Sequence, residues 1–468
     1  MKEYTEINSA TIDSWVADGW EWGVPITHEV YEKALRGEWG VYLTPTKTVP
    51  HGWFGEMRGK PFFRSLQEGN GMFIKEPAKE IPVIGEYDVA VCGGGVAGVA
   101  AALAAARNGA KTLLIEKQFA LGGLATLGLI TIYLPLCDGC GRQVSFGIAE
   151  ELLRLSIKHG WEDKYPASWL ENGTKAGRIK QRFEVQYNAS VFAILCEELL
   201  QESGVEILYG TSVCALQKEE NRISALILEN KSGRQAVLVG AVADCTGDAD
   251  ICAMSGADTA AFQQGNILAA WYYAQNKNRV DLKMLGFADV PDKYKTEAQK
   301  QVQQRRYQGV SGAQLSEMVQ DAHRYLLDDF LKSGGITPHH NLTSIASIPQ
   351  VRMTRRLCGA YTMEDTEMHK HFEDSVGLFS DWRKPGPVYE LPLRTLYSGK
   401  VRNLAAAGRC ISVTDDMWDI TRVIPVCAVS GQAAGTALAM SRDLTVLDVK
   451  KLQEKLKEDG VKLHETCL

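Results

Sequence analysis

The sequence lacks the features of membrane, secreted and nucleic-acid-binding proteins. No run of about 18 apolar residues occurs, so no membrane-spanning helix is expected. The opening residues MKEYTEINSATID contain no apolar core of a signal peptide, and the 11 scattered cysteines are typical of reduced cytoplasmic thiols. The net charge of −6 gives no electrostatic reason to expect nucleic acid or a membrane as a partner. We therefore predict a cytoplasmic globular protein.

Several catalytic and metal-binding motifs are also missing. Neither the HExxH zinc motif nor the GxSxG nucleophile turn is present. Cys137 and Cys140 form one CxxC pair, but no second pair completes a zinc or iron–sulfur set, so no metal site is predicted. The pair lies in a loop rich in proline and glycine. Both a redox-active disulfide and ordinary loop cysteines are compatible with this position.

A glycine-rich turn between a strand and a helix is the most informative feature present. Residues 87–117 read YDVAVCGGGVAGVAAALAAARNGAKTLLIEK, with an apolar strand at 87–91, the turn, an alanine-rich helix and a second strand at 112–115 that is followed by Glu116. Gly93 permits the tight turn, Gly95 lets the backbone approach a pyrophosphate, and Gly98 lets the helix pack closely on the strand. This pattern predicts a dinucleotide site.

The same segment restricts the choice of dinucleotide. The N-terminus of the helix offers free N–H groups and a positive dipole end to phosphates. Glu116 lies 23 residues after Gly93, near the position where a carboxylate accepts from ribose hydroxyls. An acid at this position, rather than an arginine, favours FAD or NAD over NADP. No second GxGxxG motif follows, so no separate NAD(P)H domain is expected.

Periodicity predicts the remaining secondary structure. Helical patterns cover residues 146–159, 189–203, 294–333, 426–441 and 446–459. Short runs rich in β-formers predict strands between residues 205 and 245 and at residues 401–408.

Five further segments along the chain also have recognisable sequence patterns. They are LGGLATLG at 121–128, DCTGDAD at 244–250, PQVRMTRRLCGAY at 349–361, LPLRTL at 391–396, and AAAGRCIS with TRVIPVCAVSGQAAGTALA within 405–439. Together with the glycine turn, they resemble the bacterial FAD-dependent oxidoreductases that are related to the glutathione-reductase and fumarate-reductase flavoproteins. The resemblance covers about residues 85–445.

The resemblance implies an α/β fold with two domains. A Rossmann-like FAD-binding domain, with a parallel sheet in a three-layer ββα arrangement, would carry an inserted α+β substrate or cap domain. The expected parts are a Trp-rich N-terminal extension (1–80), the FAD-binding domain (81–260), the inserted domain (261–400), the return segment of the FAD-binding domain (401–445) and a C-terminal helix (446–468).

The resemblance also implies which residues bind FAD. Those expected near the pyrophosphate are Gly93, Gly95, Ala97, Gly98, Gly247 and Asp248. Those expected at the adenosine are Glu116, with Lys117 beside it, and Val213. Those expected along the ribityl chain and the flavin ring are Gly122, Gly123, Leu124, Gly408 and Arg409.

The last small-residue helix is expected to meet the flavin. Gln432 and Ala433 would begin this helix, with its N-terminus directed at the N1–C2=O edge, where flavin reduction builds negative charge. Pro425 would stand before the helix. Arg422 would add a cation at the flavin or, alternatively, form a surface salt bridge.

Candidate groups for proton transfer or anion binding are less well defined. They are His339, His340, Tyr133, Arg352, Arg355, Arg356 and Arg394. The two histidines follow a Gly-Gly-Ile-Thr-Pro turn and could equally be solvated loop residues. The arginines of RMTRR could bind a carboxylate or form a structural ion-pair network.

The leading hypothesis for function is an FAD-dependent oxidoreductase that transfers a hydride between a small organic substrate and flavin N5. Two alternatives stay open: a reductase of an activated alkene fed by a reduced carrier, and a flavin-bearing electron-transfer subunit of a complex. The natural electron donor or acceptor is unknown, and a homo-oligomer is compatible with the sequence.

Residues 1–80 differ in composition from the rest of the chain. Five of the 10 tryptophans occur here. We expect an extension that packs its aromatic side chains on the body, and a dimerisation arm or a lid are the alternatives. Residues 1–60 also weakly resemble the leader of some bacterial S-adenosylmethionine-dependent methyltransferases, but no glycine loop of a methyltransferase follows.

Overall fold

The computed structural model describes residues 42–44, 47–48, 74, 76–160, 165–286 and 302–468. The chain divides into two compact units, Met1–Gly71 and Met72–Leu468. In the first unit, the short strands β1 (Tyr42–Thr44) and β2 (Lys47–Thr48) pair antiparallel. The tryptophans of the N-terminal extension lie outside the described residues, so the expectations for residues 1–80 stay predictions.

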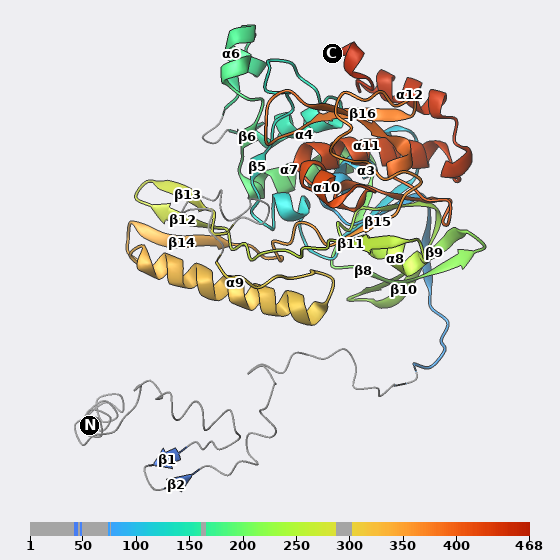
Figure 1. Cartoon of the computed structure of the whole chain (residues 1–468). Coiled ribbons are helices and arrows are strands. Elements are labelled where there is room, and N and C mark those ends of the chain that lie inside the picture. Colours follow the sequence, from blue (N-terminus) through green and yellow to red (C-terminus); the bar gives the residue numbers. More distant parts are fainter. Residues whose placement is uncertain (1–41, 45–46, 49–73, 75, 161–164, 287–301) are drawn as a thin grey trace. The chain divides into compact units, whose positions relative to one another are not determined.

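The larger unit is built around a seven-stranded sheet with the order β7-β4-β3-β10-β9-β8, and β18 also pairs with β10. Its strands β8, β9 and β10 are labelled in Figure 1. β3, β4, β7, β10 and β18 run parallel, whereas β8 and β9 add an antiparallel edge. The bounds are β3 (Val83–Cys92), β4 (Thr112–Ile115), β7 (Glu206–Leu208), β8 (Ser212–Glu219), β9 (Arg222–Asn230), β10 (Gly233–Asp244) and β18 (Leu404–Ala406).

Two helices made of small residues cover one face of this sheet. α3 (Val96–Arg107) and α11 (Ile424–Met440) are almost entirely buried and pack against each other. A Cβ atom built on Gly431 would lie 2.3 Å from the carbonyl oxygen of Ala97, and one on Gly435 would lie 2.1 Å from that of Ala101. The two backbones therefore touch at matching four-residue intervals, which is the spacing of one helix face.

Amphipathic helices flank this pair. α4 (Ile148–Ser156) packs on α11 and α7, and α7 (Ala189–Glu202) packs on α3. Asn188 caps α7, because its side-chain oxygen accepts from the backbone N–H groups of Ser190 and Val191. The other α-helices described are α5 (Ala167–Leu170), α6 (Lys175–Lys180), α8 (Asp250–Ser255), α10 (Asp415–Thr421) and α12 (Val449–Glu458).

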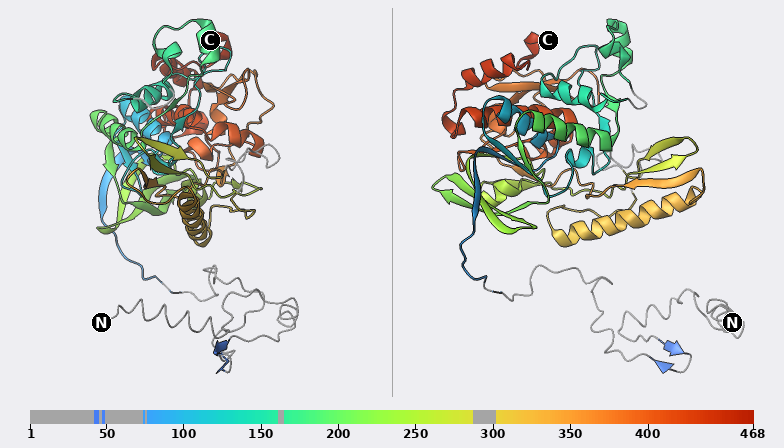
Figure 2. Two further views of the ribbon diagram at one scale, coloured as in Figure 1. Left: turned by 90° about the vertical axis from the view of Figure 1, so that its left-hand side faces the viewer. Right: turned by 180° about the vertical axis from the view of Figure 1, so that it is seen from behind.

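A separate layer contains the long helix α9 (Gly312–Lys332) beside a three-stranded antiparallel sheet, as both views in Figure 2 show. Its strands are β12 (Tyr272–Asn276), β13 (Arg279–Lys283) and β14 (His340–Ile345). Leu326 and Phe330 of α9 pack with Ala270, Tyr272 and Ala274 in a small core of their own.

The second half of the predicted inserted domain packs on the main core instead. β16 (Ser375–Ser380) pairs antiparallel with β17 (Val388–Pro392), and β16 contacts α11. Phe379 and Tyr389 belong to the same hydrophobic core as α3 and α11. Two more small pairs are β5 (Ile132–Tyr133) with β6 (Val185–Gln186), and β11 (Thr259–Ala261) with β15 (Arg355–Leu357). The predicted domain limits at 260 and 400 stay predictions.

The α/β class and the Rossmann-like architecture are confirmed, and most element limits lie close to the expected ones. Two expectations were wrong. Residues 302–311 form no helix, so α9 begins at Gly312, and residues 287–301 lie outside the described part. α11 begins at Ile424, close to the predicted helix at 426–441, so Gln432 and Ala433 lie inside the helix and not at its start.

Among the described residues, no single helix has both the length and the apolar composition of a membrane span. The bent pair α10 and α11, joined at 92°, passes the same test of length and composition together.

Candidate functional site

A cavity of about 760 Å³ opens at the carboxyl ends of the parallel strands. This volume lies within the range of small-molecule and cofactor sites, roughly 300–1,000 Å³. Its lining comes from segments that are far apart in the sequence: the glycine turn after β3, the end of β4, the loop after β10, the turn after β18 and the start of α11. Ligands of open α/β sheets bind at this edge.

The glycine turn places the N-terminus of α3 at the cavity. Gly93 has φ +101°, and a Cβ there would lie 2.5 Å from the carbonyl oxygen of Cys245. A Cβ on Gly98 would lie 1.8 Å from the carbonyl oxygen of Gly93. In contrast, nothing lies within 4 Å of the Cβ position of Gly95, which lines the cavity and is the N-cap of α3. The open space at Gly95, beside unsatisfied N–H groups of a helix start, is a cradle that fits a pyrophosphate.

Glu116 holds this turn from the end of β4. Its Oε2 accepts from the backbone N–H of Gly94 at 2.6 Å, and its Oε1 accepts from that of Gln118 at 2.8 Å. Glu116 is buried and lines the cavity, as do Lys117 and Val213. The predicted adenosine-binding residues therefore surround the same end of the cavity.

We expect Glu116→Ala to lower FAD affinity by about 10- to 100-fold, the effect of losing hydrogen bonds to a charged group. The variant loses the bonds that fix the turn, and fluorescence titration of the flavin-free protein with FAD measures the change. Glu116→Gln keeps an acceptor oxygen and should lose less. Equal FAD affinity of the unchanged protein and both variants would show that Glu116 does not contribute to FAD binding.

The double-glycine loop docks directly on the turn. The backbone N–H of Gly122 donates to the carbonyl oxygen of Gly94 at 2.8 Å, and a Cβ on Gly123 would lie 3.1 Å from Cα of Gly95. Gly122, Gly123 and Leu124 line the cavity. Small residues are needed here because two backbone segments approach each other.

Arg409 joins the return segment to two other parts of the wall. Its Nη1 donates to the carbonyl oxygens of Val351 and Arg352 at 2.9 and 3.0 Å, and its Nη2 lies 3.5 Å from Oδ1 of Asp248. Thr354 also donates to Oδ1 of Asp248 at 2.6 Å. The cavity lining includes the predicted cofactor residues Gly247, Asp248, Gly408 and Arg409. The hydrogen bonds and the ion pair described above fix the position of the Arg409 side chain.

The start of α11 corrects one predicted contact. Val423 is the N-cap, and Val423 and Ile424 line the cavity. Gln432 lies two turns further along, where its Oε1 accepts from the backbone N–H of Ile148 at 2.8 Å. Gln432 and Ala433 are buried and are absent from the cavity lining. The helix N-terminus does face the cavity as expected, but residues 423 and 424 provide it.

Apolar side chains form a further part of the cavity lining, called the apolar wall below. Its apolar residues are Ile130, Ile132, Leu134, Met284, Leu315 and Ile348. The Arg352 guanidinium lies 4.7 Å from the centre of the Trp271 ring, and the Arg422 guanidinium lies 5.9 Å from that of Trp382. Nη2 of Arg422 also lies 2.7 Å from Oδ1 of Asp419. Arg422 lines the cavity, and its ion pair with Asp419 is buried rather than a surface salt bridge; its contact with the flavin stays a prediction.

The other proposed catalytic residues lie outside the cavity lining. His340 stacks on Phe330 with ring centres 4.8 Å apart, and its Nδ1 lies 2.6 Å from the carbonyl oxygen of Gly335. His339 is exposed and directly precedes β14. Tyr133 is fully buried and donates to the carbonyl oxygen of Ala149 at 2.6 Å, and burial raises the pKa of its phenol well above the usual value.

Three of the four candidate arginines are likewise placed away from the cavity. Arg355 pairs with Asp250 at 2.6 Å, and Arg394 pairs with Asp374 at 2.9 Å. Arg356 lies over the Trp418 ring, and burial lowers its pKa. Only Arg352 of this set lines the cavity.

The CxxC pair is also remote. Cys137 and Cys140 are both free thiols, and neither lines the cavity. Burial raises the pKa of Cys137, which opposes thiolate chemistry.

Cys427, on the first turn of α11, lines the cavity beside Gly408, as do the thiols of Cys92 and Cys245 elsewhere in the lining. Burial raises its pKa to about 11. Below that pH the thiol is protonated, so at pH 8 we expect its alkylation by iodoacetamide to be about 100-fold slower than that of an ordinary thiol. Peptide mass spectrometry checks this against the exposed Cys140. Equal rates at pH 8 would show that the Cys427 thiolate is accessible.

Several cavity residues were missed by the sequence analysis. Trp271, Trp382 and Met284 come from loops and strand ends whose placement depends on distant packing. Val423 and Ile424 could have been found, because a proline in the first turn is a local mark of a helix start.

Comparison with known proteins agrees with this geometry. The family model described as "FAD dependent oxidoreductase" matches residues 88–268 and 262–456. A thioredoxin reductase of Ureaplasma parvum serovar 3 is 34% identical over 71 residues, which are 15% of this chain and 23% of that protein. An uncharacterized methyltransferase of Bacillus subtilis (strain 168), YbaJ, is 40% identical over 52 residues, which are 11% of this chain and 20% of that protein. The matches thus span less than a quarter of either relative.

Solved structures resemble the chain more broadly but at low identity. A geranylgeranyl bacteriochlorophyll reductase-like protein from Thermoplasma acidophilum is 15% identical with a TM-score of 0.42, covering 80% of this chain and 83% of that one. A glycine oxidase from Bacillus cereus ATCC 14579 is 14% identical with a TM-score of 0.37, covering 75% and 94%. The family model spans most of the chain, and the protein belongs to the FAD-dependent oxidoreductases.

Proposed function

We propose that this FAD-dependent oxidoreductase transfers a hydride between a small, largely apolar organic substrate and FAD bound in the cavity. The observation that carries the proposal is the continuity of the cavity. The cradle at Gly95 and Glu116 opens without a partition into an apolar space lined by Ile132, Ile348 and Trp271. The residues expected to hold the dinucleotide and the apolar side chains therefore line one and the same cavity.

The chain's own residues bind and orient the two molecules. Gly93, Gly95 and the first residues of α3 would hold the pyrophosphate, and Glu116 would hold the adenosine ribose. When bound, FAD supplies hydride acceptance or donation at flavin N5. The N-terminus of α11 presents a positive dipole end to the cavity, which stabilises negative charge there.

The apolar wall supports the choice of substrate class. Ile132, Leu134 and Met284 present apolar surface to the cavity, and a substrate with an apolar body would bury that surface away from water, which is favourable. Arg352 and Arg422 line the same cavity, and their guanidinium groups would orient an anionic or electron-rich group on the substrate, Arg422 less strongly because it is paired with Asp419.

Anaerobic spectroscopy of the purified, flavin-loaded protein tests the proposal. Candidate substrates with an apolar body are added without oxygen, and the flavin absorbance is followed. We expect bleaching by one substrate class without any added carrier. Bleaching only by a reduced carrier would contradict direct oxidation of a substrate and would favour the alkene reductase or the electron-transfer subunit.

A paired variant locates the reaction. Ile132→Glu would bring a carboxylate into the apolar wall, so bleaching by an active substrate should slow by at least about tenfold, the effect of a poorly solvated charge. Ile194→Glu is the control, because Ile194 is 59% exposed on α7. Equal slowing by both changes would contradict the assignment of the apolar wall to the substrate.

A further inference from the structure

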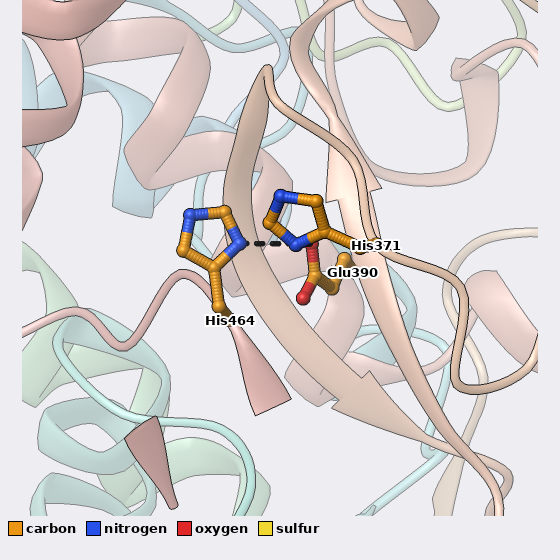
Figure 3. Close-up of side chains that lie close together, drawn as sticks. All are labelled: His371, Glu390 and His464. Carbon is orange, nitrogen blue, oxygen red and sulfur yellow. Dashed lines mark hydrogen bonds and ion pairs between the residues drawn. The ribbon is translucent and has the colours of Figure 1, made fainter. Parts of the chain in front are cut away.

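A cluster of two histidines and one glutamate lies outside the FAD cavity. Glu390 is on β17, His371 is in the loop before β16, and His464 is in the C-terminal segment after α12. Figure 3 shows the three side chains converging from these separate segments. One nitrogen or oxygen atom of each lies within 4.8 Å of those of the other two, and none of the three residues lines the cavity.

The spacing of these atoms fits the coordination shell of one small cation. Nδ1 of His464 lies 2.9 Å from Oε2 of Glu390, and Nδ1 of His371 lies 3.5 Å from the same oxygen. Bonds of about 2.0–2.2 Å from zinc to nitrogen and oxygen place the ligand atoms of a tetrahedral site about 3.3 Å apart. An ion could therefore take its place between these atoms with little movement of the chain.

The central carboxylate is held in place by the backbone. The Glu390 side chain is 6% exposed. Its Oε2 accepts from the backbone N–H of Phe372 at 2.8 Å, and its Oε1 accepts from that of Glu465 at 3.2 Å. Such outer contacts orient a metal ligand and are typical of protein metal sites.

The two imidazoles differ in access to solvent. The His371 side chain is 56% exposed, which leaves an entry path for an ion and room for a water ligand. Its Nε2 lies 3.5 Å from Oε1 of Glu373, so a second carboxylate stands on the far side of the ring. A carboxylate behind a metal-bound histidine raises the basicity of the ligand nitrogen.

We propose that His371, Glu390 and His464 bind one Zn²⁺ ion, with both histidines ligating through Nδ1 and a water molecule at the fourth position. Two imidazoles and a carboxylate form a donor set that zinc accepts in proteins. The ion would connect the β16–β17 hairpin to the C-terminal segment, which also meets this hairpin where the Ser375 hydroxyl donates to the carbonyl oxygen of Leu463. Its role is thus to fasten the end of the chain to the main core.

Competition with a chromogenic chelator tests the site on the full-length, flavin-bound protein. The protein is treated with EDTA, freed of it, and titrated with ZnCl₂ alone in the presence of the dye. We expect one Zn²⁺ per chain and a rise in the midpoint of thermal unfolding when the site is filled. His371→Gln and His464→Gln should each weaken binding by at least about tenfold and reduce the thermal shift.

Two controls separate this site from other zinc-binding side chains. His323→Gln removes an exposed histidine of α9, and Cys467→Ser removes an exposed thiol three residues after His464. Both should bind Zn²⁺ as the unchanged protein does. If His464→Gln fails to fold, the exposed His371→Gln decides the question.

Two results would overturn the proposal. One is the absence of saturable Zn²⁺ binding to the unchanged protein. The other is binding that persists in both histidine variants or disappears in Cys467→Ser, since either pattern places the ion elsewhere.

Discussion

Gly95→Val is expected to yield a folded protein that retains almost no FAD. The backbone at Gly95 has φ −66° and ψ 178°, which any residue adopts, and nothing lies within 4 Å of the Cβ position. A valine side chain would therefore fit the flavin-free chain and occupy the space that the pyrophosphate needs. The ratio of flavin to protein absorbance after purification, with circular dichroism as a check of folding, measures the effect.

A graded series and a matched control sharpen this prediction. Gly95→Ala adds one carbon and should retain more FAD than Gly95→Val. Gly312→Val is the control, because Gly312 also has open space at its Cβ position but lies at the start of α9, outside the cavity lining. Full flavin content in Gly95→Val would show that the phosphates bind elsewhere.

Gly435→Val is expected to destabilise the protein strongly. A Cβ at Gly435 would lie 2.1 Å from the carbonyl oxygen of Ala101, so α11 must move away from α3. Overpacking of this kind costs about 1–3 kcal/mol, and more where backbone has to shift. Thermal or urea unfolding measures the loss.

The same control serves here. Gly312→Val should change the free energy of unfolding by less than about 0.5 kcal/mol, as is usual for an exposed position. A Gly435→Val protein as stable as the control would contradict the close contact between α3 and α11.

Local patterns predicted the nucleotide-binding half of the fold well. The predicted strand at 112–115 lies between Gly109 and Glu116, and these neighbouring residues set its limits. β4 has the predicted limits. The strand, turn and helix at 87–107 are also a local unit, and the residues expected to contact FAD there line one cavity, apart from Gly98, which packs on the backbone of Gly93.

The small residues of α11 were compatible with two roles, close approach to the flavin and close packing on another helix. The sequence alone did not distinguish these roles. Gln432 and Ala433 were expected to begin this helix at the flavin, whereas the stretch from Gly431 to Gly435 around them is the surface that touches α3. Glycine serves close approach to a ligand and close approach to another helix equally well. Pro425 and the helical pattern over residues 426–441 both marked the true start of α11.

Contacts between distant segments were beyond the reach of the sequence. His339 and His340 stand next to a turn that fits a catalytic loop, yet the packing of β14 on α9 keeps them out of the cavity lining. His371, Glu390 and His464 have no motif spacing, and no metal site was predicted from the sequence. Their convergence depends on the C-terminal segment meeting the β16–β17 hairpin.

The central claim is that the cavity beside Gly95 holds FAD and that a substrate in the same cavity exchanges a hydride with it. The most direct measurement is a parallel determination of flavin content and anaerobic substrate bleaching for the unchanged protein and Gly95→Val. We predict one FAD per chain and bleaching for the unchanged protein, and neither for the variant. A colourless unchanged protein that releases no flavin on denaturation would contradict the account.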